Sequence, residues 1–140
     1  MKSTVRCIIH PTEDVQRVER AIENILGSIT FSLTKFDEFT EIYSSNANKT
    51  NFAVLRQLIH DKKILDAVRV RLLKNLDEFT TFIQFDKQAA YSGKIRLIDN
   101  INENPPLGAI EIRFEFESEP QFEEFIDWFS PRTKDGRVIN

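Results

Sequence analysis

Hydrophobic and polar residues alternate in four parts of the chain, and each alternation predicts a β-strand. The clearest runs over residues 110–116, where every second side chain is apolar and charged side chains lie between. Residues 2–10 and 79–85 alternate in the same way, and Phe79 is expected on the inner face of the latter strand. Residues 29–44 alternate less regularly, which predicts one bent strand or two short ones.

Apolar residues three and four positions apart predict the helices. Residues 15–26 are typical of an amphipathic helix, with Thr12 as the expected N-cap and Gly27 just after the last turn. Residues 51–76 carry two apolar stripes, which predict two short helices or one kinked helix. A final helix is expected from residue 119, with phenylalanines along one side.

A short polar turn joins two predicted extended segments. Asp86 is placed to cap a helical turn over residues 87–91, and this turn contains Lys87 and Gln88. Residues 95–97 then continue an apolar face, which predicts a strand that returns beside the first.

The order strand, helix, strands, helices, strands, helix predicts an α+β fold, a mostly antiparallel sheet with helices packed on one face. The chain has 140 residues, no internal repeat and no linker-like stretch, so we expect a single domain over residues 1–140. Ile8 and Phe82 are apolar residues on the outward sides of predicted strands. They indicate a partly covered second face or edge pairing, as in a homodimer.

Composition narrows the class of protein. A net charge of −3 argues against a generic, charge-driven nucleic-acid binder, although it is compatible with a local basic face. Cys7 is the single cysteine, which excludes an intramolecular disulfide and a cysteine-based zinc cluster. Twelve phenylalanines indicate a phenylalanine-packed core. No apolar run reaches transmembrane length and no signal-peptide pattern occurs, so we expect a cytoplasmic protein without membrane contact.

Of the possible functions, catalysis has the least support from the residues of this chain. The sequence contains two histidines, His10 and His60, and no nucleotide-binding loop or nucleophile motif. Asp86 beside Lys87 could form an acid–base pair, but an N-cap next to a solvated lysine is the better explanation. The acids between residues 115 and 127 resemble a metal site only loosely, and a solvated acidic face is the plainer interpretation. We therefore expect no catalytic residues, no metal and no small-molecule cofactor.

Basic side chains provide candidate contacts for a polyanion. Arginine can bind phosphate through a two-pronged contact, and lysine binds it as a point charge. A nucleic-acid surface should lie away from the acidic face, because carboxylates repel phosphate. The sequence alone leaves open whether the candidates share one surface. They are Lys87, Gln88, Arg69, Lys94 and Arg132.

Five short motifs occur together and in order: HPTED at 10–14, ILDAVR at 64–69, DKQAA at 86–90, PLGAI at 106–110 and DWFSPRT at 127–133. This ordered set resembles a family of uncharacterised archaeal proteins, over nearly the whole chain. That family is similar in fold to the large-subunit ribosomal protein that holds 5S RNA, and it is related to archaeal proteins proposed to bind RNA, sometimes as dimers. The resemblance implies a ribosomal-protein-like fold and RNA binding without catalysis.

The chain departs from the family pattern at three places. Asp86 stands where the family usually has Asn, residues 104–106 replace a Glu-Ser-Pro, and Ser130 stands in place of Ala. The aspartate adds negative charge next to Lys87, where a phosphate contact is expected.

Two main hypotheses follow for the candidate residues. In the first, Lys87 and Gln88 contact RNA backbone or bases, with Arg69, Lys94 and Arg132 in support. In the second, the chain is a structural or interaction protein, a homodimer. Its Lys-Gln-Ala-Ala and Pro-Arg-Thr motifs are then architectural, and a buried polar network fixes the fold. The members of that network are Lys87, Gln88, Arg69 and Arg132. An enzyme that uses carboxylates with a metal ranks third.

Overall fold

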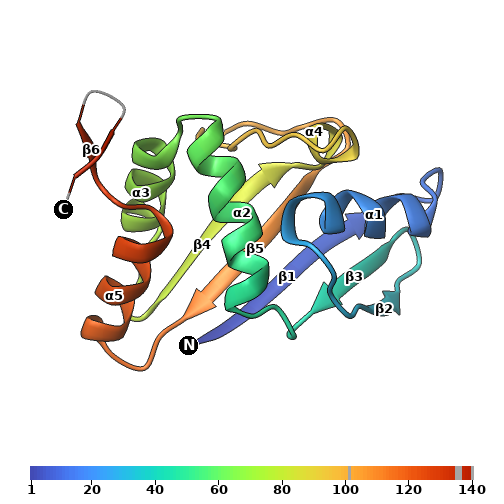
Figure 1. Cartoon of the computed structure of the whole chain (residues 1–140). Coiled ribbons are helices and arrows are strands. Elements are labelled where there is room, and N and C mark those ends of the chain that lie inside the picture. Colours follow the sequence, from blue (N-terminus) through green and yellow to red (C-terminus); the bar gives the residue numbers. More distant parts are fainter. Residues whose placement is uncertain (101, 135–136, 140) are drawn as a thin grey trace.

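The computed structural model describes residues 1–100, 102–134 and 137–139 (Figure 1). A five-stranded sheet has the order β2-β3-β1-β5-β4, and each neighbouring pair is antiparallel. The irregular alternation at 29–44 forms two short strands rather than one bent strand. The strands are β1 (Lys2–Ile9), β2 (Ser32–Lys35), β3 (Thr40–Ser44), β4 (Thr80–Asp86) and β5 (Ala109–Glu115).

The helices pack on one face of this sheet. Figure 1 shows α1 and α2 crossing in front of the strands, α3 and α5 beyond the β4 side, and α4 at the end of β4. In the described part of the chain, no helix covers the opposite face. The predicted α+β architecture is therefore confirmed. The helices are α1 (Val15–Leu26), α2 (Lys49–Asp61), α3 (Leu65–Lys74), α4 (Lys87–Tyr91) and α5 (Glu119–Phe129).

Phenylalanine rings join the sheet to the helices, as the composition predicts. Phe114 of β5 lies 5.1 Å from Phe52 of α2 and 4.8 Å from Phe125 of α5, measured between ring centroids. Phe129 of α5 is fully buried in the same cluster. Burial of each such ring contributes about 1.5–3 kcal/mol to folding, so this cluster holds α2 and α5 on the sheet.

The N-cap of α1 differs from the prediction. Asp14 caps the helix, and its carboxylate accepts a hydrogen bond from the Gln16 amide at 2.8 Å. The amide of Glu13 donates to the carbonyl of His10 at 2.9 Å, so residues 10–13 form a turn that contains Thr12. The prediction of Thr12 was wrong because the chain closes this extra turn before the helix begins.

Phe79 is 48% exposed, so its predicted inward position was also wrong. A tight turn precedes β4: the Asp77 amide donates to the Thr80 carbonyl at 2.8 Å, and Glu78 has a φ of 55°. The strand begins at Thr80, after this turn. Thr81, Ile83 and Phe85 occupy the inner face as expected.

Residues 95–97, which were predicted to form a returning strand, run along the edge of β4 but do not form a regular strand of the sheet. One isolated bridge links Phe85 to Leu97, and the Ile98 amide donates to the Gln84 carbonyl at 2.9 Å. The amide of Asp86 donates to a carbonyl of the same segment at 2.9 Å. This irregular segment therefore covers part of a strand edge that would otherwise be open to pairing.

The C-terminal tail lies against α3. Its strands β6 (Thr133–Lys134) and β7 (Arg137–Val138) pair as a small hairpin. The Thr133 hydroxyl donates to the Asp66 carboxylate of α3 at 2.5 Å. Asp135 and Gly136 lie outside the described residues. No helix in the described ranges is both long and apolar enough to cross a membrane.

Candidate functional site

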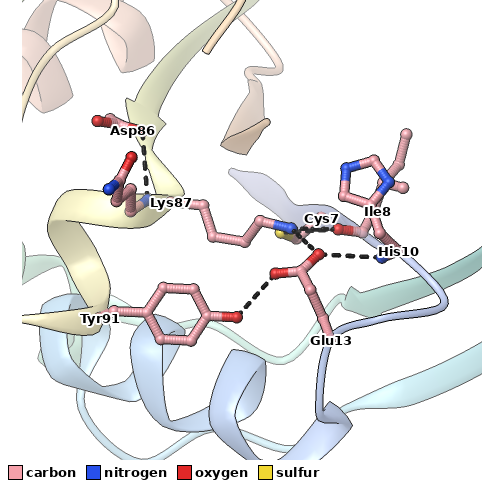
Figure 2. A network of polar contacts seen from close by, with 8 residues as sticks. Cys7, Ile8, His10, Glu13, Asp86, Lys87 and Tyr91 are labelled. Atoms are coloured by element: carbon pink, nitrogen blue, oxygen red, sulfur yellow. Dashed lines mark hydrogen bonds and ion pairs between the residues drawn. The ribbon is translucent and has the colours of Figure 1, made fainter. Parts of the chain in front are cut away.

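Lys87, the first residue of α4, is fully buried. β4 ends at Asp86, whose carboxylate accepts a hydrogen bond from the Gln88 amide at 3.2 Å and so caps α4 as predicted. This turn directs the Lys87 side chain under the helix, toward β1 and the start of α1 (Figure 2). Its ammonium donates to the Ile8 carbonyl at 2.6 Å and to the Glu13 carboxylate at 2.8 Å.

Glu13 is the centre of this buried network. One carboxylate oxygen accepts from Lys87 and from the His10 amide at 3.0 Å, and the other accepts from the Tyr91 hydroxyl at 2.8 Å. Burial acts to raise the pKa of Glu13, but these hydrogen bonds outweigh it and hold the pKa below its usual value. Burial, together with the hydrogen bond to Glu13, raises the pKa of Tyr91.

This network holds parts of the fold together. It joins β1, the turn before α1, and both ends of the short helix α4, and each polar group in it has a partner (Figure 2). The predicted contact of Lys87 with RNA is corrected, because a side chain with no exposed area cannot reach a ligand. The predicted buried polar network forms around Lys87, but Gln88 and Arg132 are exposed and take no part in it.

Basic side chains surround the outer surface of α4. Gln88 and Lys94 are exposed there, as the RNA hypothesis requires. Lys62, at the end of α2, donates its ammonium to the Ile95 carbonyl at 2.6 Å, so it reaches the residue that follows Lys94, and its chain neighbour Lys63 is exposed.

The first helix reaches the same surface from the other side. The Asn24 side chain of α1 donates to the Ala90 carbonyl of α4 at 2.9 Å. Arg17 lies two turns before Asn24 on that helix and is close enough to Tyr91 for its charge to act on the tyrosine pKa. We call the group formed by Arg17, Lys62, Lys63, Gln88 and Lys94 the α4 surface.

The negative charge of Asp86 is neutralised locally. Its second carboxylate oxygen accepts from the Arg96 guanidinium at 3.1 Å, and Arg96 also pairs with Glu103. The hydrogen bonds to these two carboxylates raise the pKa of Arg96. The Asp86 carboxylate therefore caps α4 and is paired with Arg96, so it is not an isolated negative charge at the α4 surface.

Arg69 and Arg132 lie elsewhere. Arg69 of α3 donates to the Ser130 carbonyl at 3.1 Å and pairs with Asp127 at 2.9 Å, so it fastens α3 to the end of α5. Arg132 is exposed nearby. Both line a cavity of about 970 Å³ whose other walls include neither Lys87 nor the α4 surface. The five predicted candidates therefore divide between two places.

This cavity is an apolar groove with an acidic rim. It lies between α3, α5 and the C-terminal hairpin. The acids between residues 115 and 127 are exposed, as predicted for a solvated acidic face, and several of them border the groove. Its apolar side chains include Leu73, Phe79, Phe122 and Val138, and its acids include Glu78, Glu119 and Glu123.

Another cavity, of about 430 Å³, opens on the uncovered face of the sheet. Lys2 and Thr4 of β1, Tyr43 of β3 and Arg113 of β5 contribute to its walls. Among the described residues, no group of three or more His, Cys, Asp or Glu side chains could hold a metal ion.

Three residues of the α4 surface were not predicted from the sequence: Arg17, Lys62 and Lys63. Lys62 and Lys63 stand out in the sequence as a polar joint between two apolar stripes, but no local signal shows that this joint meets α4. Arg17 lies on the polar face of an amphipathic helix, which is where solvated charges are normally found. Their association depends on contacts between residues far apart in the chain.

The fold and these surfaces define an α+β domain with one open sheet face and a buried lysine–glutamate anchor. A family model described as RNA binding matches residues 3–116. A UPF0201 protein of Pyrococcus horikoshii is 33% identical over 135 residues, which cover 96% of this chain and 93% of the relative. A UPF0201 protein of Aeropyrum pernix is 30% identical over 142 residues, which cover 99% and 91%.

A solved structure gives the same assignment. The crystal structure of a UPF0201 protein from Methanococcus jannaschii matches the full length of both chains with a TM-score of 0.85 and 29% identity. The chain therefore belongs to the UPF0201 family of archaeal proteins, and the family model that matches it is the one described as RNA binding. The resemblance to an archaeal family is confirmed. The likeness to the ribosomal protein that holds 5S RNA stays a prediction.

Proposed function

We propose that this chain binds RNA without acting on it chemically, and that the α4 surface contacts the RNA phosphates. The observation that carries the proposal is the cluster of exposed cations around α4 in a chain whose net charge is −3. A polyanion binds where positive charge is concentrated, because each contact releases counterions from the nucleic acid. The match to the RNA-binding family model supports the same function.

The residues at and below the α4 surface then have different roles, and Lys62 holds the end of α2 beside the segment after α4 through the Ile95 carbonyl. Lys63, Lys94 and Arg17 contact phosphates, and Gln88 offers an amide that can donate to phosphate or to a base edge. Lys87 acts as a positioning residue, because its buried ion pair fixes the start of α4.

Arg69 and Arg132 were expected to support RNA binding. They lie beside Asp127 and the acidic rim of the groove, where phosphate would be repelled. We therefore leave them out of the proposed contact surface.

Fluorescence anisotropy with labelled single-stranded and hairpin RNA tests this function. Affinity should fall steeply between about 50 and 200 mM salt, since phosphate contacts dominate it. The variant Lys63→Ala/Lys94→Ala should bind more weakly, and the slope of log K against log salt should drop by about 1–2. Arg132→Ala/Lys134→Ala removes the same charge at the groove and should change neither quantity.

Two outcomes would contradict the proposal. One is the absence of binding by the unchanged protein to either RNA at micromolar concentration and low salt. The other is equal weakening by the two double variants, which would mean that total charge, rather than the α4 surface, controls binding.

A second candidate function is self-association through the acidic groove. Leu73 and Phe79 are 47% and 48% exposed in its wall, a larger apolar exposure than isolated surface residues usually show. The C-terminal hairpin carries exposed Lys134 and Arg137 beside apolar Val138, so it complements the acidic, apolar groove of a second copy. In this candidate function the dimer contact would lie away from Ile8 and Phe82, on which the sequence prediction rested.

Light scattering tests this candidate. A concentration-dependent dimer is expected, and Phe79→Ser should weaken it, while Phe36→Ser, at an equally exposed position in the β2–β3 turn, should not. A monomeric mass at every concentration up to the millimolar range would exclude it.

A further inference from the structure

The open sheet face has a hollow centred on Thr4. Thr4 pairs with Arg113 across β1 and β5, and Lys2 and Arg6 are its neighbours along β1 on the same face. Tyr43 of β3 pairs with Arg6 and forms the other side. The threonine side chain is short and those around it are long, so the cavity of about 430 Å³ opens above it.

The chemistry of this hollow suits a flat, polar ring next to a negative charge. Tyr43 offers an aromatic face, and Thr4 and Ser45 offer hydroxyl groups. The Arg113 guanidinium lies 5.0 Å from the centroid of the Phe82 ring, which orients its planar group on the sheet surface. Lys2 adds a flexible positive charge at the rim.

We propose that this Thr4 hollow binds an unpaired base of single-stranded RNA. The inference rests on the proposed RNA-binding function and adds a second contact region to it. The base stacks on Tyr43, while Lys2 and Arg113 contact the phosphates on either side. The volume lies within the range of about 300–1,000 Å³ that is usual for small-ligand pockets.

Phe82 provides a second stacking position on the same face if a base displaces the Arg113 guanidinium that lies over its ring. In the strand order β3-β1-β5-β4, Tyr43 and Phe82 lie three strands apart. The two residues are also offset by two positions in the register. At about 4.8 Å per strand and about 3.4 Å per residue the separation is about 16 Å, which a short stretch of nucleotides can span. The bases of a duplex cannot reach both rings, because they are stacked inside the helix.

The acids on this face determine which RNA contacts are favourable. Glu41 pairs with Arg6 at 3.5 Å, and Glu111 accepts from Gln84 at 3.2 Å and pairs with Arg113 at 3.7 Å, so a phosphate at Arg113 would compete with this carboxylate. Glu115 is exposed at the hollow and lies opposite Lys2 in the strand register. It would repel a phosphate bound there, so neutralising it should increase affinity.

Binding of a labelled ten-nucleotide oligouridylate at about 100 mM salt tests the hollow. Tyr43→Leu should weaken binding by about tenfold, since stacking on an aromatic ring contributes strongly to each bound base. Glu115→Gln should strengthen binding about two- to fivefold, a gain that partial unfolding cannot produce. Phe36→Leu changes an exposed aromatic outside the hollow and is the matched control.

The outcomes separate this inference from the function on which it rests. If the unchanged protein binds no RNA, the proposed function fails and the inference fails with it. A different result separates the two. If the unchanged protein binds RNA and Lys63→Ala/Lys94→Ala weakens that binding, the proposed function stands. If Tyr43→Leu and Glu115→Gln then both leave the affinity unchanged, the proposed role of the Thr4 hollow is overturned. Equal affinity for a ten-base-pair duplex would also overturn recognition of an unpaired base.

Discussion

The ammonium of Lys87 lies 2.8 Å from the carboxylate of Glu13, although the two residues are 74 positions apart in the chain. Neither charge reaches solvent freely, because Lys87 is fully buried and the Glu13 side chain is 8% exposed. The pair fixes α4 against β1 and the start of α1. The basic residues of the α4 surface come from α1, from the end of α2 and from the loop after α4. Their arrangement therefore depends on the buried Lys87–Glu13 pair, which is not itself part of the proposed RNA contact.

Replacement of Lys87 by methionine should lower the free energy of unfolding by about 3–5 kcal/mol, because Glu13 would keep a buried charge without its partner. Urea denaturation measures the loss. The double variant Lys87→Met/Glu13→Gln removes both charges and leaves an amide oxygen for Tyr91, so it should recover much of that stability. If Lys87→Met is as stable as the unchanged protein, the pair is not the anchor that its geometry indicates.

Acid should weaken the same anchor. The pKa of Glu13 in the folded protein lies below its ordinary value of 4.5, so the unfolded chain binds the proton more readily. The stability that this group contributes is present above about pH 4.5 and is lost as the pH falls through the folded pKa. Urea unfolding between pH 3 and pH 7 should show this loss, and Glu13→Gln should show a shallower one. Parallel pH curves for the two proteins would refute the assignment.

At alkaline pH the stability should depend on Cys7, which lies on β1 near Lys87. Burial raises the pKa of the Cys7 thiol from 9.0 to about 11, although the positive charge of Lys87 acts against the shift. The folded protein therefore keeps the thiol neutral while the unfolded chain ionises it. The stability contributed by Cys7 is fully present below pH 9.0 and is lost as the pH rises through about 11. Cys7→Ala should make stability less dependent on pH between 9 and 11, measured by urea unfolding under reducing conditions.

The sequence predicts the elements of this fold better than it predicts their contacts. The alternation around Ile112 and the glycine after α1 are local signals, and both correspond to the structure. The burial of Lys87 is not a local property, because a lysine in the first turn of a polar helix is normally solvated. Its burial follows from the position of Glu13, which no periodicity in the sequence connects to α4.

The residues of the α4 surface likewise divide into those predicted from local sequence and those brought together only by the fold. Gln88 was predicted from the turn at residues 87–91 and Lys94 from the extended segment that follows it, and both are exposed. Lys63 could not be added to them, because the chain reaches that place only after α2 has crossed the sheet. Arg69 was predicted to support binding as a free cation, but its contacts with the end of α5 form only when α3 and α5 pack together.

Gly93 controls the direction in which the chain leaves α4 toward Lys94. Its φ is 72°, a left-handed conformation that side chains with a Cβ rarely adopt, and a Cβ built there meets no atom within 4 Å. Gly93→Ala should therefore cost about 1–2 kcal/mol through backbone strain alone. The same strain should move Lys94 and weaken RNA binding at the α4 surface.

Gly93→Asn separates strain from side-chain size. Asparagine is larger than alanine, but it tolerates the left-handed region far better, so this variant should be the more stable of the two and should keep more RNA affinity. Thermal unfolding and RNA-binding anisotropy of the unchanged protein, Gly93→Ala and Gly93→Asn test this expectation. If asparagine is at least as damaging as alanine, the space around Gly93 rather than its φ matters, and the turn does not position Lys94 in the way proposed.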